Sequence, residues 1–264
     1  MLQLLKVEWL KLKNYRTFWI LFALYVASIY GINYITYLIQ HEILREMKQE
    51  GTIKAIIGTP YSFPDVWMQT PYMTGFLLFL MGLGIIIPTT NEFSFKTHRQ
   101  NIVDGWSRME FINVKLAMVG IIALATTIVV IITALIFGFQ EDAPFSMEKF
   151  EYIVYFFFQA FTYGCAALLM SILIKRSGLV MAVYFAYAVI IENVLGLYMI
   201  HKLKLHGEYL PLNASDALIP FPFFQRATDT FMEQPNYTML YILVLAYIAL
   251  FIFFIMRRFQ RSDL

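Results

Sequence analysis

Residues 116–140 read LAMVGIIALATTIVVIITALIFGFQ, twenty-five residues between Lys115 and Glu141 that contain no charged side chain and no histidine. A helix needs about 20 mostly apolar residues to cross the hydrocarbon core of a bilayer. This run therefore predicts a membrane-spanning helix. The period-two alternation that is typical of a transmembrane β-barrel is absent, so a barrel is disfavoured.

The rest of the chain has the same character. Of 264 residues, 59% are hydrophobic and only 14% are charged, whereas a soluble domain has about 25% charged residues. This composition excludes a water-soluble enzyme, a soluble binding module and a disordered chain. Five further runs are long enough to span, one of them with Glu192 inside it. We expect an all-α membrane protein, a single domain over residues 1–264, with spans at about 17–40, 70–91, 112–139, 152–174, 178–200 and 236–256.

Basic residues are unevenly divided between the two sides of these spans. If the N-terminus is cytoplasmic, the segments on that side hold thirteen of the twenty lysines and arginines. Cytoplasmic loops carry the excess of basic residues in membrane proteins. We therefore expect a multi-pass protein of a bacterial cell (inner) membrane, with both termini cytoplasmic and loops 41–71 and 201–235 outside. A net charge of +2 is no footprint of nucleic-acid binding, so membrane lipid is expected as a partner and nucleic acid is not.

The first segment, MLQLLKVEWLKLKNYRTF, predicts a helix with Leu2, Leu5, Trp9 and Leu12 on one apolar stripe. Because the segment is basic and carries a tryptophan, we expect an interfacial helix that lies in the membrane plane before the first span. The alternative is that it simply forms the cytoplasmic end of a long first helix.

The inside loop, residues 91–115, reads NEFSFKTHRQNIVDGWSRMEFINVK. We expect a short helix over residues 94–103 that ends at Gly105, where a left-handed conformation costs little. Ser107 and Glu110 have the spacing of a capping box, so the third span should start near Met109. Two interpretations stay open: a docking element for a partner, or an ordinary solvated basic loop.

This loop resembles the stretch after the second span in ABC type 2 transporter permeases, the membrane subunits of ATP-driven exporters. The family pattern is an acidic residue, T-x-R, G-x-S-R and then a lysine. It is matched here by Glu92, Thr97, Arg99, Gly105, Ser107, Arg108 and Lys115. Lys96 stands where the family often has a glycine. The first segment, with Glu8, Lys11, Leu12 and Arg16, and the basic tail RRFQRSDL also resemble that family.

The resemblance implies that the loop is a coupling helix that docks in a groove of a separate ATP-binding-cassette ATPase subunit in the cytoplasm. Arg99 and Arg108 would then form charge-assisted bonds to that partner, His98 and Phe95 would fill the groove, and Glu92 would brace the loop. A second permease subunit, identical or related, would complete the pore. None of the thirteen glycines is followed by lysine, so the chain lacks a P-loop. We expect no enzyme activity in this chain, and ATP and Mg on the partner.

Glu192 is the one acidic residue inside a span, where a charge costs a few kcal/mol unless it is paired, protonated or facing water. It is either a transport-pathway residue or a hydrogen-bonded residue of the bundle. Beyond it, residues 208–235 predict a re-entrant or interfacial lid, with a helical turn over 213–219 capped by Asn213 or Ser215. His201 and His206 lack a third ligand, so no metal site is expected.

The function that these observations favour is the pore-forming permease subunit of an ABC exporter. Two alternatives remain. An ion-coupled secondary transporter would show several charges inside the membrane, and a non-transporting membrane anchor conflicts with none of these features.

Overall fold

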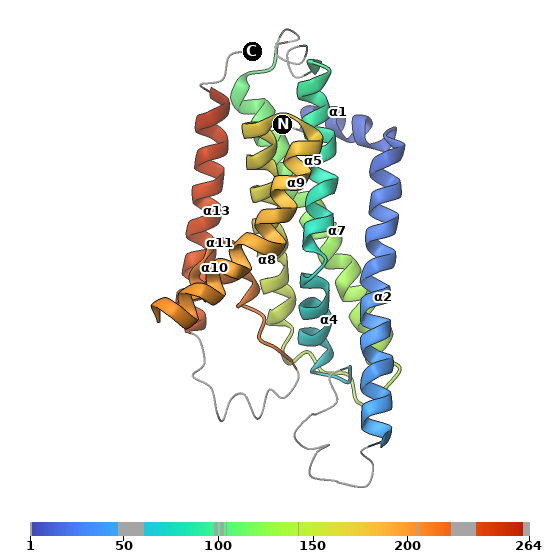
Figure 1. Cartoon of the computed structure of the whole chain (residues 1–264). Coiled ribbons are helices and arrows are strands. Elements are labelled where there is room, and N and C mark those ends of the chain that lie inside the picture. The colour runs from blue at the N-terminus through green and yellow to red at the C-terminus, as the bar shows by residue number, and fades with distance from the viewer. Residues whose placement is uncertain are drawn as a thin grey trace.

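The computed structural model describes residues 2–46, 61–97, 100, 103, 105–141, 143–204, 206–222 and 236–260. The fold is all-α, as predicted, and these residues contain no strand (Figure 1). The long helices are α2 (Arg16–Glu46), α5 (Leu78–Ser94), α7 (Arg108–Gly138), α8 (Glu151–Ile174) and α13 (Tyr237–Gln260). The shorter helices are α1 (Leu2–Lys13), α4 (Val66–Gly75), α9 (Ser177–Phe185), α10 (Glu192–Tyr198) and α11 (Pro211–Asp216).

Five helical segments in the described part of the chain are long and apolar enough to cross a membrane: Arg16–Ile43, Arg108–Gly138, Glu151–Ile174, Ser177–Leu203 and Tyr237–Gln260. A bent pair, α4 and α5, makes the sixth candidate. The segment Ser177–Leu203 joins α9 and α10 through two π-helical turns, Ala186–Ile191 and Met199–Leu203. The chain is therefore a multi-pass membrane protein with five to six candidate spans.

The expected span at 70–91 is not one straight helix. α4 and α5 meet at an angle of 51°. α4 ends at Gly75, and a Cβ on this glycine would lie 3.1 Å from the amide nitrogen of Gln159 on α8. Each of the two helices also contains a proline, Pro71 and Pro88, and proline removes a helical hydrogen bond. The break thus lies where α4 approaches α8 closely, between two helices that each contain a proline.

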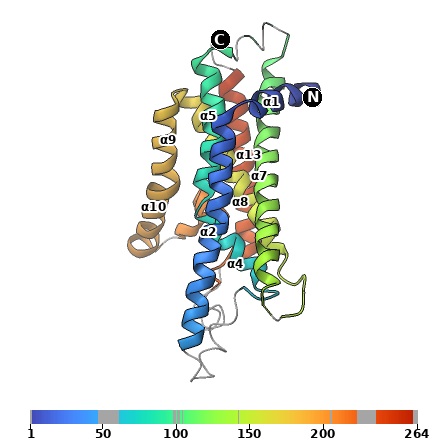
Figure 2. The ribbon, with the colours of Figure 1, turned by 90° about the vertical axis from the view of Figure 1, so that its right-hand side faces the viewer.

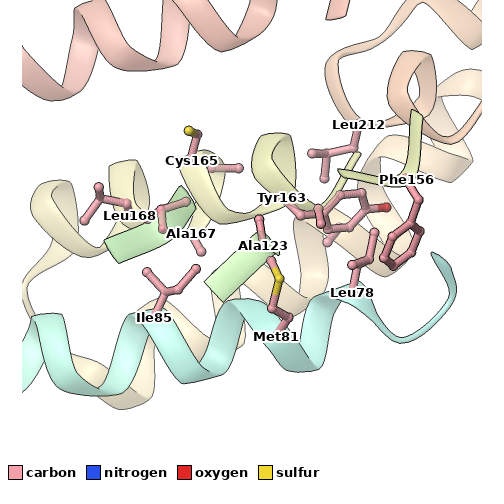
Figure 3. Close-up of a cluster of buried hydrophobic side chains, with 14 of the residues drawn as sticks. Leu78, Met81, Ile85, Ala123, Phe156, Tyr163, Cys165, Ala167, Leu168 and Leu212 are labelled. Carbon is pink, nitrogen blue, oxygen red and sulfur yellow. The ribbon is translucent and has the colours of Figure 1, made fainter. Parts of the chain in front are cut away.

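α8 lies at the centre of the bundle. More than half of its most apolar stretch is buried inside the protein, 61% against 22–39% for the other single-helix spans. Figure 3 shows side chains of α5, α7 and α8, with Leu212, packed into one apolar cluster. Gly164 permits a close approach of α8 to α7, because a Cβ there would lie only 2.6 Å from a methyl group of Val119 on α7. Small residues allow helix backbones to approach closely inside a membrane.

α1 does not continue α2. Both views show it lying across one end of the bundle, turned away from the direction of α2 (Figures 1 and 2). The indole of Trp19 donates to the carbonyl of Lys13, 3.1 Å away, and so satisfies an orphan carbonyl at the end of α1. Of the predicted apolar stripe, Leu12 is buried against the bundle and Trp9 is 46% exposed, while Glu8 is buried beside Leu12. Glu8 can occupy the inner face of α1 because Lys11 and Lys115 pair with its carboxylate there. Whether the exposed residues of α1 contact lipid stays a prediction.

The elements expected on the cytoplasmic side gather at one end of the bundle, called the α1 end below. It comprises α1, the connection between α5 and α7, the turn between α8 and α9, and the last residues of α13 (Figure 1). The topology prediction requires this common end, whereas the side of the membrane on which it lies stays a prediction.

Candidate functional site

Four charged side chains form a closed ring of ion pairs at the α1 end. Lys11 Nζ lies 2.6 Å from Oε1 of Glu8 and 3.1 Å from Oε1 of Glu92. Lys115 Nζ lies 2.6 Å from Oε2 of Glu8 and 2.8 Å from Oε2 of Glu92. Each lysine thus bridges two carboxylates and each carboxylate bridges two lysines. The ring joins three elements that are far apart in the sequence: α1, the end of α5 and the start of α7.

The ring is largely withdrawn from solvent. Glu8, Glu92 and Lys115 are 3%, 8% and 6% exposed, and only Lys11 reaches the surface in part. An unpaired charge at such a site would carry a desolvation penalty of several kcal/mol. Because the signs alternate and cancel, the charges satisfy one another. Removing any one member would leave an uncompensated charge among apolar side chains.

The pKa values of the two ring members on α1 move in the directions that this pairing requires. Burial alone would raise the pKa of Glu8, but the ammonium groups of Lys115 and Lys11 hold it below its ordinary value. Burial alone would lower the pKa of Lys11, but the carboxylates of Glu92 and Glu8 raise it. Both residues are therefore charged at neutral pH.

Helix geometry explains why α1 supplies two members of the ring. Glu8 and Lys11 are three residues apart, so their side chains leave the same face of the helix. Leu12 on that face packs with Phe18 and Met118 in a small apolar cluster beside the ring. Lys11 also lies over the ring of Trp106, at 5.8 Å from its centroid. These contacts hold α1 against the start of α7.

The predicted docking segment leaves the bundle after Phe93, whose side chain still packs in the core. Phe95 is 75% exposed and Thr97 is exposed, with its hydroxyl 3.5 Å from the carbonyl of Glu92. Lys96 has a φ of 58°, in the left-handed region that favours glycine. Of the expected helix over 94–103, Ser94 is the last residue of α5, Phe95 and Lys96 form a turn, and Thr97, Gln100 and Val103 are helical. His98 and Arg99 lie outside the described residues.

The second half of the connection has the predicted local structure. Gly105 has a φ of 100° and is the left-handed residue that the sequence indicated. Ser107 and Glu110 form the reciprocal capping box, and α7 begins at Arg108. Arg108 donates to the carbonyl of Gln260 at 2.7 Å, so it ties α7 to the end of α13. Whether Arg108 also contacts a partner stays a prediction.

Glu192 is buried at the joint between α10 and α11, with 2% of its surface exposed. Its Oε1 accepts hydrogen bonds from the backbone N–H groups of Leu212 at 2.5 Å and Asn213 at 3.0 Å. The structure therefore gives Glu192 the surroundings of the hydrogen-bonded alternative, and its role in transport stays a prediction. The expected capping of this turn by Asn213 or Ser215 is wrong: α11 spans Pro211–Asp216 and has no side-chain cap of its own. Glu192, from a different helix, takes that role.

A half-buried carboxylate, which the sequence analysis did not single out, lies on α11. Asp216 accepts hydrogen bonds from Nε2 of Gln159 at 2.8 Å and from the hydroxyl of Tyr163 at 3.0 Å. It borders a cavity of about 250 Å³ between α10 and α11 that is also lined by Asn193, Asn213 and Glu208, among others. Asp216 belongs to a segment that the sequence predicts as an outside loop. Its contacts with Gln159 and Tyr163 become visible only in the packing of α11 against α8. Of the expected lid over 208–235, residues 223–235 lie outside the described part of the chain.

The comparisons with known proteins add no family to this picture. No protein-family model matches the chain, and no curated protein matches it. The structure itself shows a multi-pass, all-helical membrane protein.

Proposed function

We propose that this chain is the pore-forming permease subunit of an exporter of the ABC type 2 class. It would work with a second permease subunit and with a cytoplasmic ATP-binding-cassette subunit that binds ATP and Mg. The substrate crosses between the two permease subunits as they change their relative position. The support comes from the α1 end, together with the family resemblance of its sequence.

The observation that carries the proposal is the shape of the connection between α5 and α7. It starts with a left-handed residue, Lys96, at the position where the family often has a glycine. It ends with Gly105 at φ 100° and the capping box of Ser107. Phe95 and Val103, 75% and 79% exposed, point apolar groups away from the bundle. A conformation defined at both ends, with apolar groups displayed, suits a docking element better than a solvated loop.

The ion-pair ring gives this connection a mechanical basis. Glu92 on α5 and Lys115 on α7 flank the connection and pair with each other. Glu92 also pairs with Lys11 of α1, and Lys115 pairs with Glu8 of α1. A force applied to the connection by a partner would therefore reach α1, α5 and α7 together. Coupling through a packed element with discrete arrangements is the physical basis of such transmission.

The test is co-purification of the ATPase with a tagged chain in mild detergent, followed by measurement of ATP hydrolysis and transport. We expect Phe95→Ala and Arg99→Ala to weaken retention of the ATPase while membrane insertion stays normal. Truncation of a buried interface charge costs about 2–5 kcal/mol, or roughly thirtyfold or more in affinity. Arg16→Ala, an exposed arginine on α2 outside the connection, is the matched control. Normal retention and transport in both test variants would refute the docking role.

One observation favours a second candidate, an ion-coupled transporter. Glu192 is buried and Asp216 is half-buried near one cavity, and among the described residues neither carboxylate forms an ion pair with a lysine, arginine or histidine. Intramembrane carboxylates mark ion pathways in coupled transporters. Transport by the purified chain alone in vesicles, driven by a pH gradient without ATP, would establish this candidate over the first.

A further inference from the structure

We infer that the groove between α8 and α13 at the α1 end is a binding site for one anionic phospholipid. The groove has a volume of about 450 Å³, within the range of sites for small molecules. Its apolar walls are Leu169 and Leu173 of α8 and Phe254 of α13. Arg257 and Arg258, in the last turn of α13, complete the lining.

The depth of the two arginines matches that of lipid headgroups. Arg257 follows Tyr237, the first residue of α13, by twenty residues in one continuous helix, a distance of about 30 Å at 1.5 Å per residue. The hydrocarbon core of a bilayer is about 30 Å thick. When α13 spans the membrane, the guanidinium groups therefore lie at the boundary, with Phe254 and the two leucines just inside the hydrocarbon.

The charge at the boundary selects an anionic headgroup. Both arginines are exposed, and none of the described residues that line the groove is acidic. The guanidinium of Arg257 lies 5.8 Å from the ring centroid of Phe253, a contact that orients it along the helix. A guanidinium binds phosphate oxygens in pairs, and basic sites between spanning helices bind anionic lipid headgroups.

The apolar part of the groove selects a lipid over a free anion. Inorganic phosphate would contact only the two arginines and leave Leu169, Leu173 and Phe254 uncovered. An acyl chain covers these three side chains while its headgroup remains on Arg257 and Arg258. A phospholipid therefore satisfies both halves of the site at once. This inference does not depend on the transport function proposed above.

The test measures lipid retention by the purified chain in mild detergent with native mass spectrometry. The probes are phosphatidylglycerol and phosphatidylcholine with identical acyl chains. We expect one phosphatidylglycerol to be retained in preference to phosphatidylcholine. The double variant Arg257→Gln/Arg258→Gln should weaken that binding about thirtyfold, the equivalent of about 2 kcal/mol for two basic residues. Arg257→Lys/Arg258→Lys keeps both charges but loses the paired hydrogen bonds of the guanidinium, so its binding should lie between that of the unmodified chain and that of the glutamine double variant.

Three controls make the result decisive. Arg16→Gln removes an exposed arginine from the same end of the bundle and should change nothing. Leu173→Trp fills the groove while both arginines stay, and it should lower retention, whereas a large excess of inorganic phosphate should not displace the lipid. Equal binding of the two lipids, or unchanged binding in the glutamine double variant, would overturn the assignment. Displacement by phosphate would overturn it too, as would a second copy of the chain retained in place of lipid.

Discussion

At the scale of single residues, the ring of Glu8, Lys11, Glu92 and Lys115 decides how α1 is held. Each member has two partners of opposite sign. The ring therefore behaves as one unit, and the losses of stability caused by single substitutions in it should not add up in double variants.

We predict that Lys115→Met destabilises the protein by about 3–5 kcal/mol, because it leaves two buried carboxylates with one lysine. The double variant Glu8→Gln/Lys115→Met retains the Lys11–Glu92 pair and balances the charge, so it should be more stable than Lys115→Met alone. Thermal unfolding in detergent measures both. A double variant whose loss equals the sum of the two single losses would show that the ring is not a unit.

The same residues predict a pH dependence at both extremes. The pKa of Glu8 lies below its ordinary value of 4.5 in the folded protein. Its contribution to stability is therefore complete above pH 4.5 and is lost as the pH falls through the lowered pKa. The pKa of Lys11 is raised above 10.5, so its contribution is complete below pH 10.5 and is lost as the pH rises through the raised pKa. Unfolding midpoints against pH should fall at both ends, and Glu8→Gln should flatten the acid limb. An acid limb identical in Glu8→Gln would contradict this origin.

At the scale of elements, two short segments each depend on one residue, α11 on a residue of another helix and the α5–α7 connection on a glycine of its own. α11 is only six residues long, and its N-terminal N–H groups are satisfied by Glu192 on α10. The connection between α5 and α7 depends on Gly105 for a backbone conformation that other residues rarely adopt.

We predict that Glu192→Leu releases α11, whereas Glu192→Gln keeps it in place. The glutamine amide oxygen can still accept both hydrogen bonds, but leucine leaves two buried N–H groups unpaired at about 1–3 kcal/mol each. Ser215 is fully buried, so Ser215→Cys in a Cys165→Ala background reports the release by its rate of maleimide labelling. Labelling should rise in Glu192→Leu only. If Glu192→Gln labels slowly and still loses transport, the residue also serves the pathway.

Gly105, in the connection, and Gly178, in α9, offer a matched pair of glycine-to-alanine substitutions. A Cβ at Gly105 or at Gly178 would meet no atom within 4 Å, but only Gly105 has a positive φ. Gly105→Ala should therefore cost about 1–2 kcal/mol through backbone strain alone. Gly178→Ala, at the start of α9, should be neutral or stabilising by up to about 1 kcal/mol. Unfolding midpoints of the two variants test this directly, and equal midpoints would show that the backbone conformation at Gly105 carries no strain.

At the scale of the whole molecule, the spans were predictable and their internal breaks were not. The run at 116–140 lacks charges, so its length alone predicts α7. The bend after Gly75 lies beside Gln159, more than eighty residues away, and the length and hydrophobicity of the run at 66–91 do not indicate where it bends. For the site, Gly105 and the Ser107 capping box follow from local chemistry. Glu8, Lys11 and Lys115 were named only as positions of a family pattern, and their meeting with Glu92 is a tertiary event.

The whole-molecule prediction is the orientation of the bundle. We expect the α1 end to be cytoplasmic because thirteen of the twenty basic residues belong to that side. Single cysteines at Ser262 and at Thr52, each in a Cys165→Ala background, can be labelled in intact cells with a membrane-impermeant maleimide. Only the cysteine at position 52 should react. Reaction at position 262 from outside would reverse the orientation.

The ion-pair ring also has a consequence for biosynthesis. Lys115 is made 107 residues after Glu8, its partner on α1. At about 5–20 residues per second, the ribosome needs roughly 5–20 s to cover that distance. Until Lys115 is made, the ring is incomplete and α1 stays at the membrane surface without its full set of partners. Two hydrophobic segments, α2 and the bent pair of α4 and α5, are inserted during this interval. α1 is synthesised before its partners on α5 and α7 and is therefore among the last parts of this end to reach its final place, and a ribosomal pause before Lys115 would lengthen its exposure.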